Sequence, residues 1–303
     1  MADIIIVGAG PAGLSAAIYA RRAGMDTVVY EANIYGGQII NTPEVENYPA
    51  IAKISGFDFA NDLYNQATNL GARVEFDGVT SVSGSAEEGF TVELASGGKE
   101  TAKAVILAVG ATNRHLGIDR EEELTGKGVS YCATCDGAFY KGKTVAVNGG
   151  GNTAVEDAIY LAGLVEKVYL IHRRNEFRAD ETLVKAAKAI PNLEIVTPFV
   201  INELKGSPKL DGIVLENRED QSTKELAVDG LFVAIGQEPK TAMFKDLVTL
   251  SGGYIEGGED CKTNVKGIFV AGDVRTKKVR QLTTACADGA VAALAAVDFI
   301  KLG

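Results

Sequence analysis

Short apolar runs that end at glycine recur along this chain, and they predict parallel strands that lead into helices. The first run, residues 3–7, reads Asp-Ile-Ile-Ile-Val and predicts a buried strand. Glycine-rich residues 8–13 follow, and an alanine-rich amphipathic pattern then predicts a helix to about Ala23, with Gly24 as its stop signal. Residues 27–30 predict a second strand. The chain therefore opens with a complete strand–helix–strand unit.

The same order of elements returns in the middle of the chain. An apolar strand is predicted over residues 143–148, and a second glycine-rich turn follows at residues 149–154. A helix is predicted to about Leu164, and a further strand over residues 168–171. Because the whole pattern is repeated, we expect a second domain of the same kind to begin here.

The first glycine-rich turn has the spacing of a dinucleotide-binding fingerprint. Gly8 permits a tight turn, Gly10 lets the backbone approach a pyrophosphate, and Gly13 lets the helix pack closely on the strand. The free N–H groups at the start of the helix then face the phosphates. Glu31, at the end of the next strand, can accept hydrogen bonds from a ribose 2′-hydroxyl. This arrangement favours an unphosphorylated adenosine ribose, as in FAD or NAD.

The second turn carries the same template on Gly149, Gly151 and Ala154. In the register of the first unit, the position of Glu31 is taken here by His172, which two arginines follow. A carboxylate there would repel a 2′-phosphate, whereas guanidinium groups bind it in a bidentate manner. The sequence therefore favours NADPH, through Arg173 and Arg174 with Arg178 nearby. The alternative is that these arginines form a solvated cationic turn.

Two further segments predict where the chain passes from one domain to the other. Residues 105–110 and 230–236 are each a strand that runs into glycine and then into polar residues. We therefore predict an α/β fold with two Rossmann-like nucleotide-binding domains of three-layer ββα architecture. The first domain is discontinuous, with residues 1–112 and 243–303, and the second spans residues 113–242.

Composition and charge exclude several other classes of protein. The 303 residues are enough for two domains, and the net charge of −10 argues against nucleic acid as the main partner. The longest apolar stretch, residues 285–300, is interrupted by Asp288 and Asp298, so no membrane-spanning helix is expected. No basic segment precedes the first strand, and four cysteines are too few for a disulfide scaffold. We expect a cytoplasmic α/β enzyme.

Two of the cysteines lie close together just ahead of the second glycine-rich turn. Cys132 and Cys135 can close a small, reducible disulfide, and such spacing can lower the pKa of a thiol. Closing so short a loop stabilises a fold little, which weakens the alternative of a purely structural disulfide. Asp136 follows directly, as a helix cap, a solvated acid or a general acid for the pair.

A zinc site is the other alternative for this pair. It usually needs four ligands, and the remaining candidates are the isolated Cys261 and Cys286 and two histidines. Cys261 is interpreted as a loop thiol and Cys286 as a helix packing residue, and no metal is expected. Reduction of a disulfide takes two electrons, which a hydride from NADPH carries and a flavin can pass on. The sequence therefore favours a redox relay.

With these residues in view, the chain resembles the low-molecular-weight thioredoxin reductases of the bacterial type over nearly its whole length. The resemblance is carried jointly by several motifs: residues 8–13, 36–38, 45–49, 132–136, 149–151, 172–174, 177–179, 272–274 and 280–281. It implies an NADPH-dependent flavoprotein that passes electrons through FAD to the Cys132–Cys135 disulfide and then to thioredoxin. It also implies a cytoplasmic homodimer whose NADPH domain rotates.

The resemblance further implies which residues contact the cofactors. Those expected at FAD are Gly8, Ala9, Gly10, Pro11, Ala12, Gly13, Glu31, Gly37, Gln38, Asn47, Gly272, Asp273, Arg280, Gln281 and Leu282. Those expected at NADPH are Gly149, Gly151, Asn152, Thr153, Ala154, His172, Arg173, Arg174 and Arg178. In the redox pair, Cys135 would face the flavin, Cys132 would attack the thioredoxin disulfide, and Asp136 would act as the acid/base.

Other functions remain to be separated from this one. Flavoproteins that reduce a peroxidase subunit, dithiol oxidases that pass electrons to oxygen, and relatives of ferredoxin–NADP reductase share parts of the pattern. The last of these lack the two cysteines. A non-enzymatic flavin- or metal-binding redox sensor is the alternative from a different class.

Overall fold

The computed structural model describes residues 1–302, and these residues form two compact units. Unit 1 contains Met1–Thr112 and resumes at Glu238, and unit 2 contains Asn113–Gln237. The return to unit 1 lies at Glu238, where the sequence predicted 243. The difference arises because β16 (Gln237–Pro239) pairs with β7 (Ala111–Asn113), so the returning chain crosses beside the departing one.

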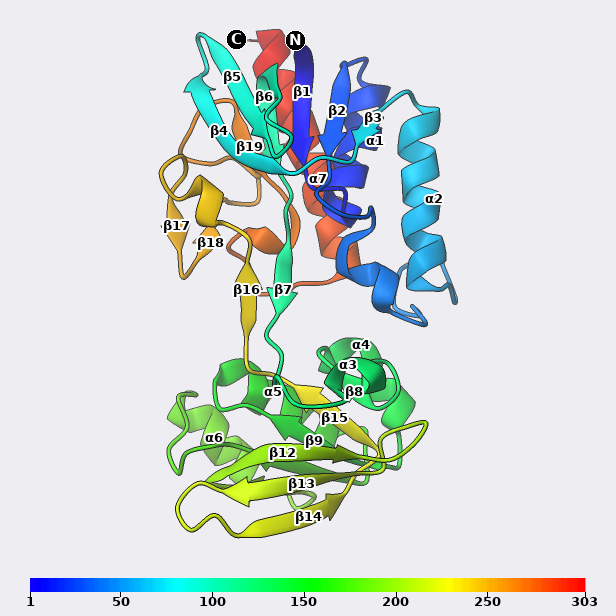
Figure 1. Cartoon of the computed structure of the whole chain (residues 1–303), viewed down its shortest axis with the longest axis vertical. Helices are drawn as coiled ribbons and strands as arrows, with labels where there is room; N and C mark the ends of the chain where they lie inside the picture. The colour runs from blue at the N-terminus through cyan, green and yellow to red at the C-terminus, as the bar shows by residue number, and fades with distance from the viewer. Residues whose placement is uncertain (303) are drawn as a thin grey trace. The chain divides into compact units, whose positions relative to one another are not determined.

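A seven-stranded sheet forms the centre of unit 1 (Figure 1). Its order is β3-β2-β1-β6-β5-β4, with β19 paired to the second half of β6. The strands are β1 (Ala2–Val7), β2 (Thr27–Tyr30), β3 (Arg73–Glu75), β4 (Val79–Ser85), β5 (Gly89–Leu94), β6 (Lys99–Leu107) and β19 (Ile268–Val270). β1, β2, β3, β6 and β19 are parallel, whereas β4, β5 and β6 form an antiparallel meander.

The helices of unit 1 cover one face of the parallel strands. They are α1 (Pro11–Arg22), α2 (Gly56–Asn69) and α7 (Leu282–Leu302). Ile4 and Ile6 of β1 face α1 and α7, whereas Ile5 and Val7 face a second cluster that includes Phe90 of the meander. This alternation along one strand gives the sheet two buried faces. Short elements complete the unit: η1 (Gly37–Asn41), η3 (Ala242–Phe244), β17 (Leu250–Ser251), β18 (Tyr254–Ile255) and η4 (Gly272–Val274).

Unit 2 is built on a five-stranded parallel sheet of order β11-β10-β9-β15-β8. The strands are β8 (Val129–Ser130), β9 (Thr144–Asn148), β10 (Lys167–Ile171), β11 (Leu193–Val196) and β15 (Gly230–Val233). A separate antiparallel sheet contains β12 (Phe199–Lys205), β13 (Gly212–Asn217) and β14 (Thr223–Ala227). The helical elements are α3 (Glu121–Leu124), α4 (Ala133–Asp136), η2 (Gly137–Tyr140), α5 (Asn152–Ala162) and α6 (Glu181–Lys188).

The two faces of β9 show why unit 2 has three layers. Val145 and Val147 lie in a core cluster with residues of α5, whereas Ala146 lies in a cluster with Ile213 and Leu215 of β13. One face is therefore covered by helices and the other by the antiparallel sheet. The predicted α/β fold of two Rossmann-like, three-layer units, with the first one discontinuous, is confirmed.

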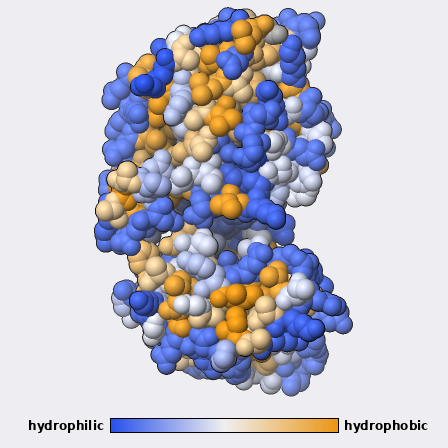
Figure 2. Space-filling model, turned by 180° about the vertical axis from the view of Figure 1, so that it is seen from behind, coloured by the Kyte–Doolittle hydropathy of each residue, from blue (hydrophilic) through white to orange (hydrophobic). Residues whose placement is uncertain are grey.

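No helix among residues 1–302 is both long enough and apolar enough to cross a membrane. α7 is the longest helix of unit 1, and it contains the buried Asp288. The face drawn in Figure 2 carries hydrophilic residues over much of each unit, with smaller hydrophobic patches between them.

Candidate active site

The first glycine-rich turn connects β1 to α1, and of Gly8, Gly10 and Gly13 only Gly10 has open space beside it. A Cβ on Gly13 would lie 1.8 Å from the carbonyl oxygen of Gly8, so only glycine allows this close approach of helix and strand. A Cβ on Gly10 would meet nothing within 4 Å. The space beside Gly10 is where the backbone of a dinucleotide-binding turn approaches a pyrophosphate. The turn therefore fits a bound nucleotide.

These two glycines give a matched pair of variants. Gly13→Ala should destabilise unit 1 by about 3 kcal/mol, because backbone must move to relieve the clash. Gly10→Ala should leave the cofactor-free fold intact but weaken cofactor binding. Thermal unfolding and the flavin absorbance of the purified proteins measure the two effects. Equal stability of the two variants would contradict this interpretation of the turn.

Glu31 stands at the end of β2 and holds the turn in place. Its Oε2 accepts a hydrogen bond of 2.8 Å from the backbone N–H of Ala9, and its Oε1 accepts one of 3.1 Å from Asn33. An ionised carboxylate has about four acceptor positions, so two remain for the predicted ribose hydroxyls.

Asp273 carries the clearest sign of a missing polar partner. Within residues 1–302, its Oδ1 is the buried side-chain atom without a hydrogen-bond partner. Burial raises the pKa of this carboxyl group, because the charged form is poorly solvated. Buried acceptors are normally satisfied, so a hydroxyl donor from a bound group fits here. The polyhydroxy chain of a flavin dinucleotide offers such donors.

A buried ionic cluster positions the segment that carries Asp273. Asp288 of α7 accepts hydrogen bonds from the backbone N–H of Gly272 at 3.0 Å, from Nη2 and Nε of Arg275 at 2.9 and 3.2 Å, and from Lys277 at 2.8 Å. Burial opposes ionisation of Asp288, but the hydrogen bonds from Arg275 and Lys277 lower its pKa overall. Sequence analysis noted Asp288 only as an interruption of an apolar stretch, and the structure shows that it fixes this turn.

The remaining residues predicted at FAD also lie in unit 1. Gly37 approaches Gly10, and a Cβ on Gly272 would lie 2.8 Å from that of Ala12, so segments distant in sequence meet at the first turn. Gln38 donates to the carbonyl oxygen of Ala111, Asn47 donates to Gln281 at 3.3 Å, and Arg280 donates to the carbonyl oxygen of Asp273 at 3.2 Å. Pro11 begins α1 and Leu282 begins α7. The contacts of all these residues with a flavin stay a prediction.

The second glycine-rich turn connects β9 to α5 and repeats the geometry of the first. A Cβ on Gly149 would lie 2.3 Å from the carbonyl oxygen of Ala234 and 2.6 Å from the Cβ of Ala154, whereas one on Gly151 would meet nothing within 4 Å. Asn152 exchanges hydrogen bonds of 2.9 Å with Asp180, which orders the start of α5. Thr153 is exposed beside it. The open side of Gly151 fits a second nucleotide.

The ring of His172 is buried beside the second turn. Its ring is buried against Gly150, where a Cβ would lie 2.2 Å from the ring, and its Nε2 donates to the carbonyl oxygen of Glu176 at 3.2 Å. Burial lowers the pKa of His172, so the ring is neutral near pH 7. The side chain therefore supports the turn, and its contact with NADPH stays a prediction. Arg173, Arg174 and Arg178 are exposed and keep their predicted role as phosphate ligands.

One basic residue of this region was missed by sequence reasoning. A hollow of about 260 Å³ is lined by Arg173, Arg174, Val200 and Arg218. Arg218 lies in the turn between β13 and β14, far along the chain from the other two arginines. No local motif surrounds Arg218. Its place beside the other two arginines depends on how the antiparallel sheet packs, which the sequence pattern does not reveal.

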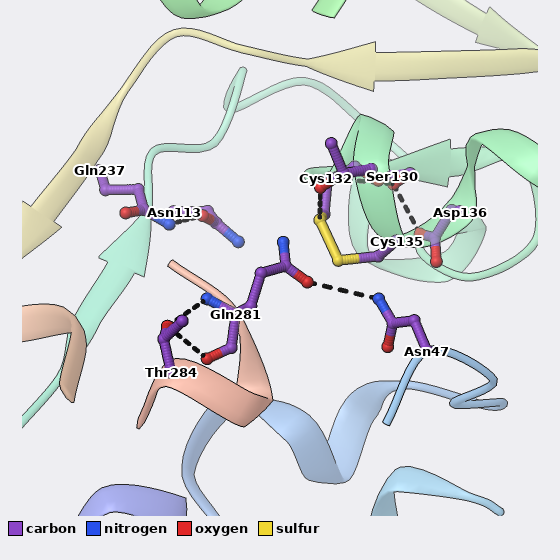
Figure 3. Close-up of a disulfide and its surroundings, with 10 residues drawn as sticks. Asn47, Asn113, Ser130, Cys132, Cys135, Asp136, Gln237, Gln281 and Thr284 are labelled. Atoms are coloured by element: carbon purple, nitrogen blue, oxygen red, sulfur yellow. Dashed lines mark hydrogen bonds between the residues drawn. A yellow bond between two sulfur atoms is a disulfide. The ribbon is translucent and has the colours of Figure 1, made fainter. Parts of the chain in front are cut away.

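Cys132 and Cys135 form a disulfide at the start of α4 (Figure 3). Cys132 is the residue that precedes the helix, and Cys135 lies three positions later, so both side chains project from one face of the turn. The Cα atoms are 5.3 Å apart, within the range that a disulfide spans. Both residues are half-buried.

A serine links the disulfide to the neighbouring acid. Ser130 Oγ donates a hydrogen bond of 2.6 Å to Asp136 Oδ2 and accepts one of 3.1 Å from the backbone N–H of Cys132, as Figure 3 shows for the first. Burial raises the pKa of Asp136, and the bond from Ser130 opposes this in part. A carboxyl group with a raised pKa beside a disulfide can hold a proton for thiol chemistry. Sequence analysis did not identify Ser130.

The other two cysteines lie in unit 1 and are unsuited to this chemistry. Cys261 and Cys286 are both buried as free thiols. Burial raises the pKa of Cys261 to about 12 and that of Cys286 to about 11, so neither is a thiolate near neutral pH. Within the described part of the chain, no three His, Cys, Asp or Glu side chains are grouped as metal ligands.

Comparison with known proteins agrees with this arrangement. Residues 2–289 match the pyridine nucleotide-disulphide oxidoreductase family. The chain is 42% identical to a thioredoxin reductase of Treponema pallidum, with 98% of this chain and 97% of the relative covered. It is 40% identical to a thioredoxin reductase of Listeria monocytogenes, with coverage of 99% and 94%.

A solved structure gives the same result in three dimensions. The thioredoxin reductase of Streptococcus pyogenes matches with a TM-score of 0.96 at 37% identity, covering 100% of this chain and 99% of that one. Similarity of this extent includes both units and the segment with the two cysteines. The family uses a flavin and a pyridine nucleotide. The chain therefore belongs to the pyridine nucleotide-disulphide oxidoreductase family, and within it to the low-molecular-weight thioredoxin reductases.

Proposed function

We propose that this chain is an FAD-containing, NADPH-dependent reductase of the thioredoxin disulfide. The observation that carries the proposal is the Cys132–Cys135 disulfide with Asp136 beside it, in a chain that has a nucleotide-binding turn in each unit. The relatives described above are thioredoxin reductases, which supports thioredoxin as the substrate.

The two cofactors are assigned by the chemistry of each turn. FAD is proposed for unit 1, where the space beside Gly10, the acceptor positions of Glu31 and the unpartnered Oδ1 of Asp273 suit its pyrophosphate and hydroxyl groups. NADPH is proposed for unit 2, where Gly151 is open and two arginines follow His172, the residue at the position that Glu31 takes in unit 1. When bound, FAD supplies the relay that passes two electrons from NADPH to the disulfide.

The cysteines then transfer these electrons to the substrate. Reduction of the Cys132–Cys135 bond consumes two electrons and two protons and leaves two thiols. The Cys132 thiolate attacks a sulfur of the thioredoxin disulfide, forms a mixed disulfide and releases one thioredoxin thiolate, which takes a proton. Cys135 next attacks the Cys132 sulfur, which releases the second thioredoxin thiolate and restores the original disulfide. Asp136 holds and returns protons at this pair.

A homodimer and a cytoplasmic location complete the proposal, as the resemblance to the family implies. Sedimentation of the flavin-loaded protein tests the first, and fractionation of cells tests the second. A compartment that keeps thiols reduced suits an enzyme that acts through a reducible disulfide.

The direct test is NADPH oxidation by the purified protein in the presence of thioredoxins from the same organism. The protein should be yellow, NADPH should bleach it, and added thioredoxin should restore the colour with turnover. Turnover with oxygen alone would favour a dithiol oxidase. Turnover only with a peroxidase partner would favour a flavoprotein that reduces a peroxidase subunit. Bleaching without any turnover would favour a sensor.

The choice between NADPH and NADH gives a further prediction. Replacing both Arg173 and Arg174 with Ala should lower the preference for NADPH over NADH by about 10²-fold, because charged hydrogen bonds to the 2′-phosphate are lost. The ratio of kcat/KM for the two nucleotides measures this preference. An unchanged ratio would contradict the assignment of the phosphate site.

A further inference from the structure

A single hollow in unit 2 brings together three arginines from two separate segments. Arg173 and Arg174 follow β10, whereas Arg218 belongs to the turn between β13 and β14. Together with Val200 they line a volume of about 260 Å³. The antiparallel sheet therefore contributes a guanidinium group to a site that the glycine-rich turn and its following strand were expected to form alone.

The backbone around Arg218 is anchored to this region at two points. The N–H of Arg218 donates to the carbonyl oxygen of Pro198 at 2.9 Å. The next residue, Glu219, accepts a hydrogen bond of 2.9 Å from Asn175, which directly follows Arg174. The β13–β14 turn is thus tied to the segment that carries the other two arginines, and Arg218 is held beside them.

The charges at the hollow are not neutralised by the chain itself. The two acidic residues that follow Arg218 form hydrogen bonds away from the three arginines: Glu219 accepts from Asn175, and Asp220 accepts from the Ser222 hydroxyl at 2.6 Å and its backbone N–H at 2.9 Å. Across residues 1–302, Arg173, Arg174 and Arg218 form no ion pair with an acidic side chain. Three unpaired cations around one hollow favour a polyanionic ligand.

We propose that Arg218 is a further ligand of the 2′-phosphate of NADPH, beside Arg173 and Arg174, and thereby helps to determine nucleotide specificity. The inference rests on the proposed NADPH site and extends it to the antiparallel sheet. A phosphate monoester carries close to two negative charges and three acceptor oxygens, which can engage guanidinium groups from several directions.

The test measures binding of nucleotide fragments to the flavin-loaded protein by calorimetry at constant ionic strength. Arg218→Ala should weaken binding of 2′,5′-ADP by at least about 10-fold and leave binding of 5′-AMP unchanged. Lys224→Ala is the matched control, because it removes a positive charge from β14 at a residue that does not line the hollow. It should change neither affinity by more than about twofold.

Two outcomes would overturn the proposal. If Arg218→Ala weakens 2′,5′-ADP and 5′-AMP equally, Arg218 contacts the part that the two fragments share and not the 2′-phosphate. If it weakens neither, Arg218 is no ligand at all. The Arg173→Ala/Arg174→Ala variant tests the NADPH site independently of Arg218. If this double variant loses 2′,5′-ADP binding while Arg218→Ala does not, the NADPH site is supported and only the role of Arg218 is wrong.

Discussion

Cys135→Ser should abolish thioredoxin reduction while NADPH still bleaches the bound flavin. The Cys132–Cys135 disulfide cannot form in this variant, so electrons that reach the flavin have no covalent route to the substrate. The expected loss of disulfide turnover is at least about 10³-fold, as for removal of a reacting nucleophile. Stopped-flow absorbance of the flavin measures the first half of the reaction, and steady-state reduction of thioredoxin measures the second.

The matched control is Cys286→Ala, which removes a buried thiol from α7 in unit 1. Burial already raises the pKa of this thiol to about 11, so its removal should leave turnover within about threefold of the wild type. Thioredoxin reduction by Cys135→Ser at the wild-type rate would show that the electrons follow another path. A loss of flavin bleaching in the same variant would instead place Cys135 in the first half of the reaction.

The core of the fold was predictable because its signals are local. Residues 27–30 were predicted as a strand and form β2 with those bounds, since a short apolar run between a helix stop signal and Glu31 has few alternatives. The residue at which the chain returns to unit 1 was harder to predict from the sequence. It depends on β16 pairing with β7, and three-residue strands carry no periodicity that a sequence pattern can reveal.

The same distinction applies to the candidate site: residues in local motifs could be predicted, and residues placed by contacts between distant segments could not. The glycine spacings and the cysteine pair are contiguous motifs. The structure places each glycine-rich turn at the start of a helix as expected, and it places the cysteine pair at the start of α4. The position of His172 was predicted from register along the chain, but its burial against Gly150 could not be, because register does not reveal which rings are buried. Ser130 and Arg218 lack a motif, and their positions come from hydrogen bonds and strand pairing that only the folded chain displays.

Asp136→Asn should reduce thioredoxin turnover by about 10² to 10⁴-fold, which is the contribution typical of a positioned acid/base. The substitution keeps an oxygen that can accept the bond from Ser130, so the geometry at the disulfide is preserved. Because burial raises the pKa of Asp136, the wild-type carboxyl group keeps its proton to higher pH than an exposed aspartic acid. Wild-type turnover should therefore fall as pH rises through this raised pKa, and the variant should lose that dependence.

The thermal stability of Asp136→Asn shows whether the variant has lost a proton donor or has lost structure. A raised pKa in the folded state means that the fold disfavours the ionised carboxylate, so wild-type stability falls as pH rises from the ordinary value through the raised one. The neutral amide in Asp136→Asn removes the cost of burying an ionised carboxylate. The midpoint of thermal unfolding of this variant near pH 7 should therefore be at least that of the wild type. Slow turnover with an undiminished midpoint assigns proton transfer to Asp136. A variant that turns over within threefold of the wild type at every pH would remove Asp136 from the mechanism, and Ser130 would then serve only to shape the turn.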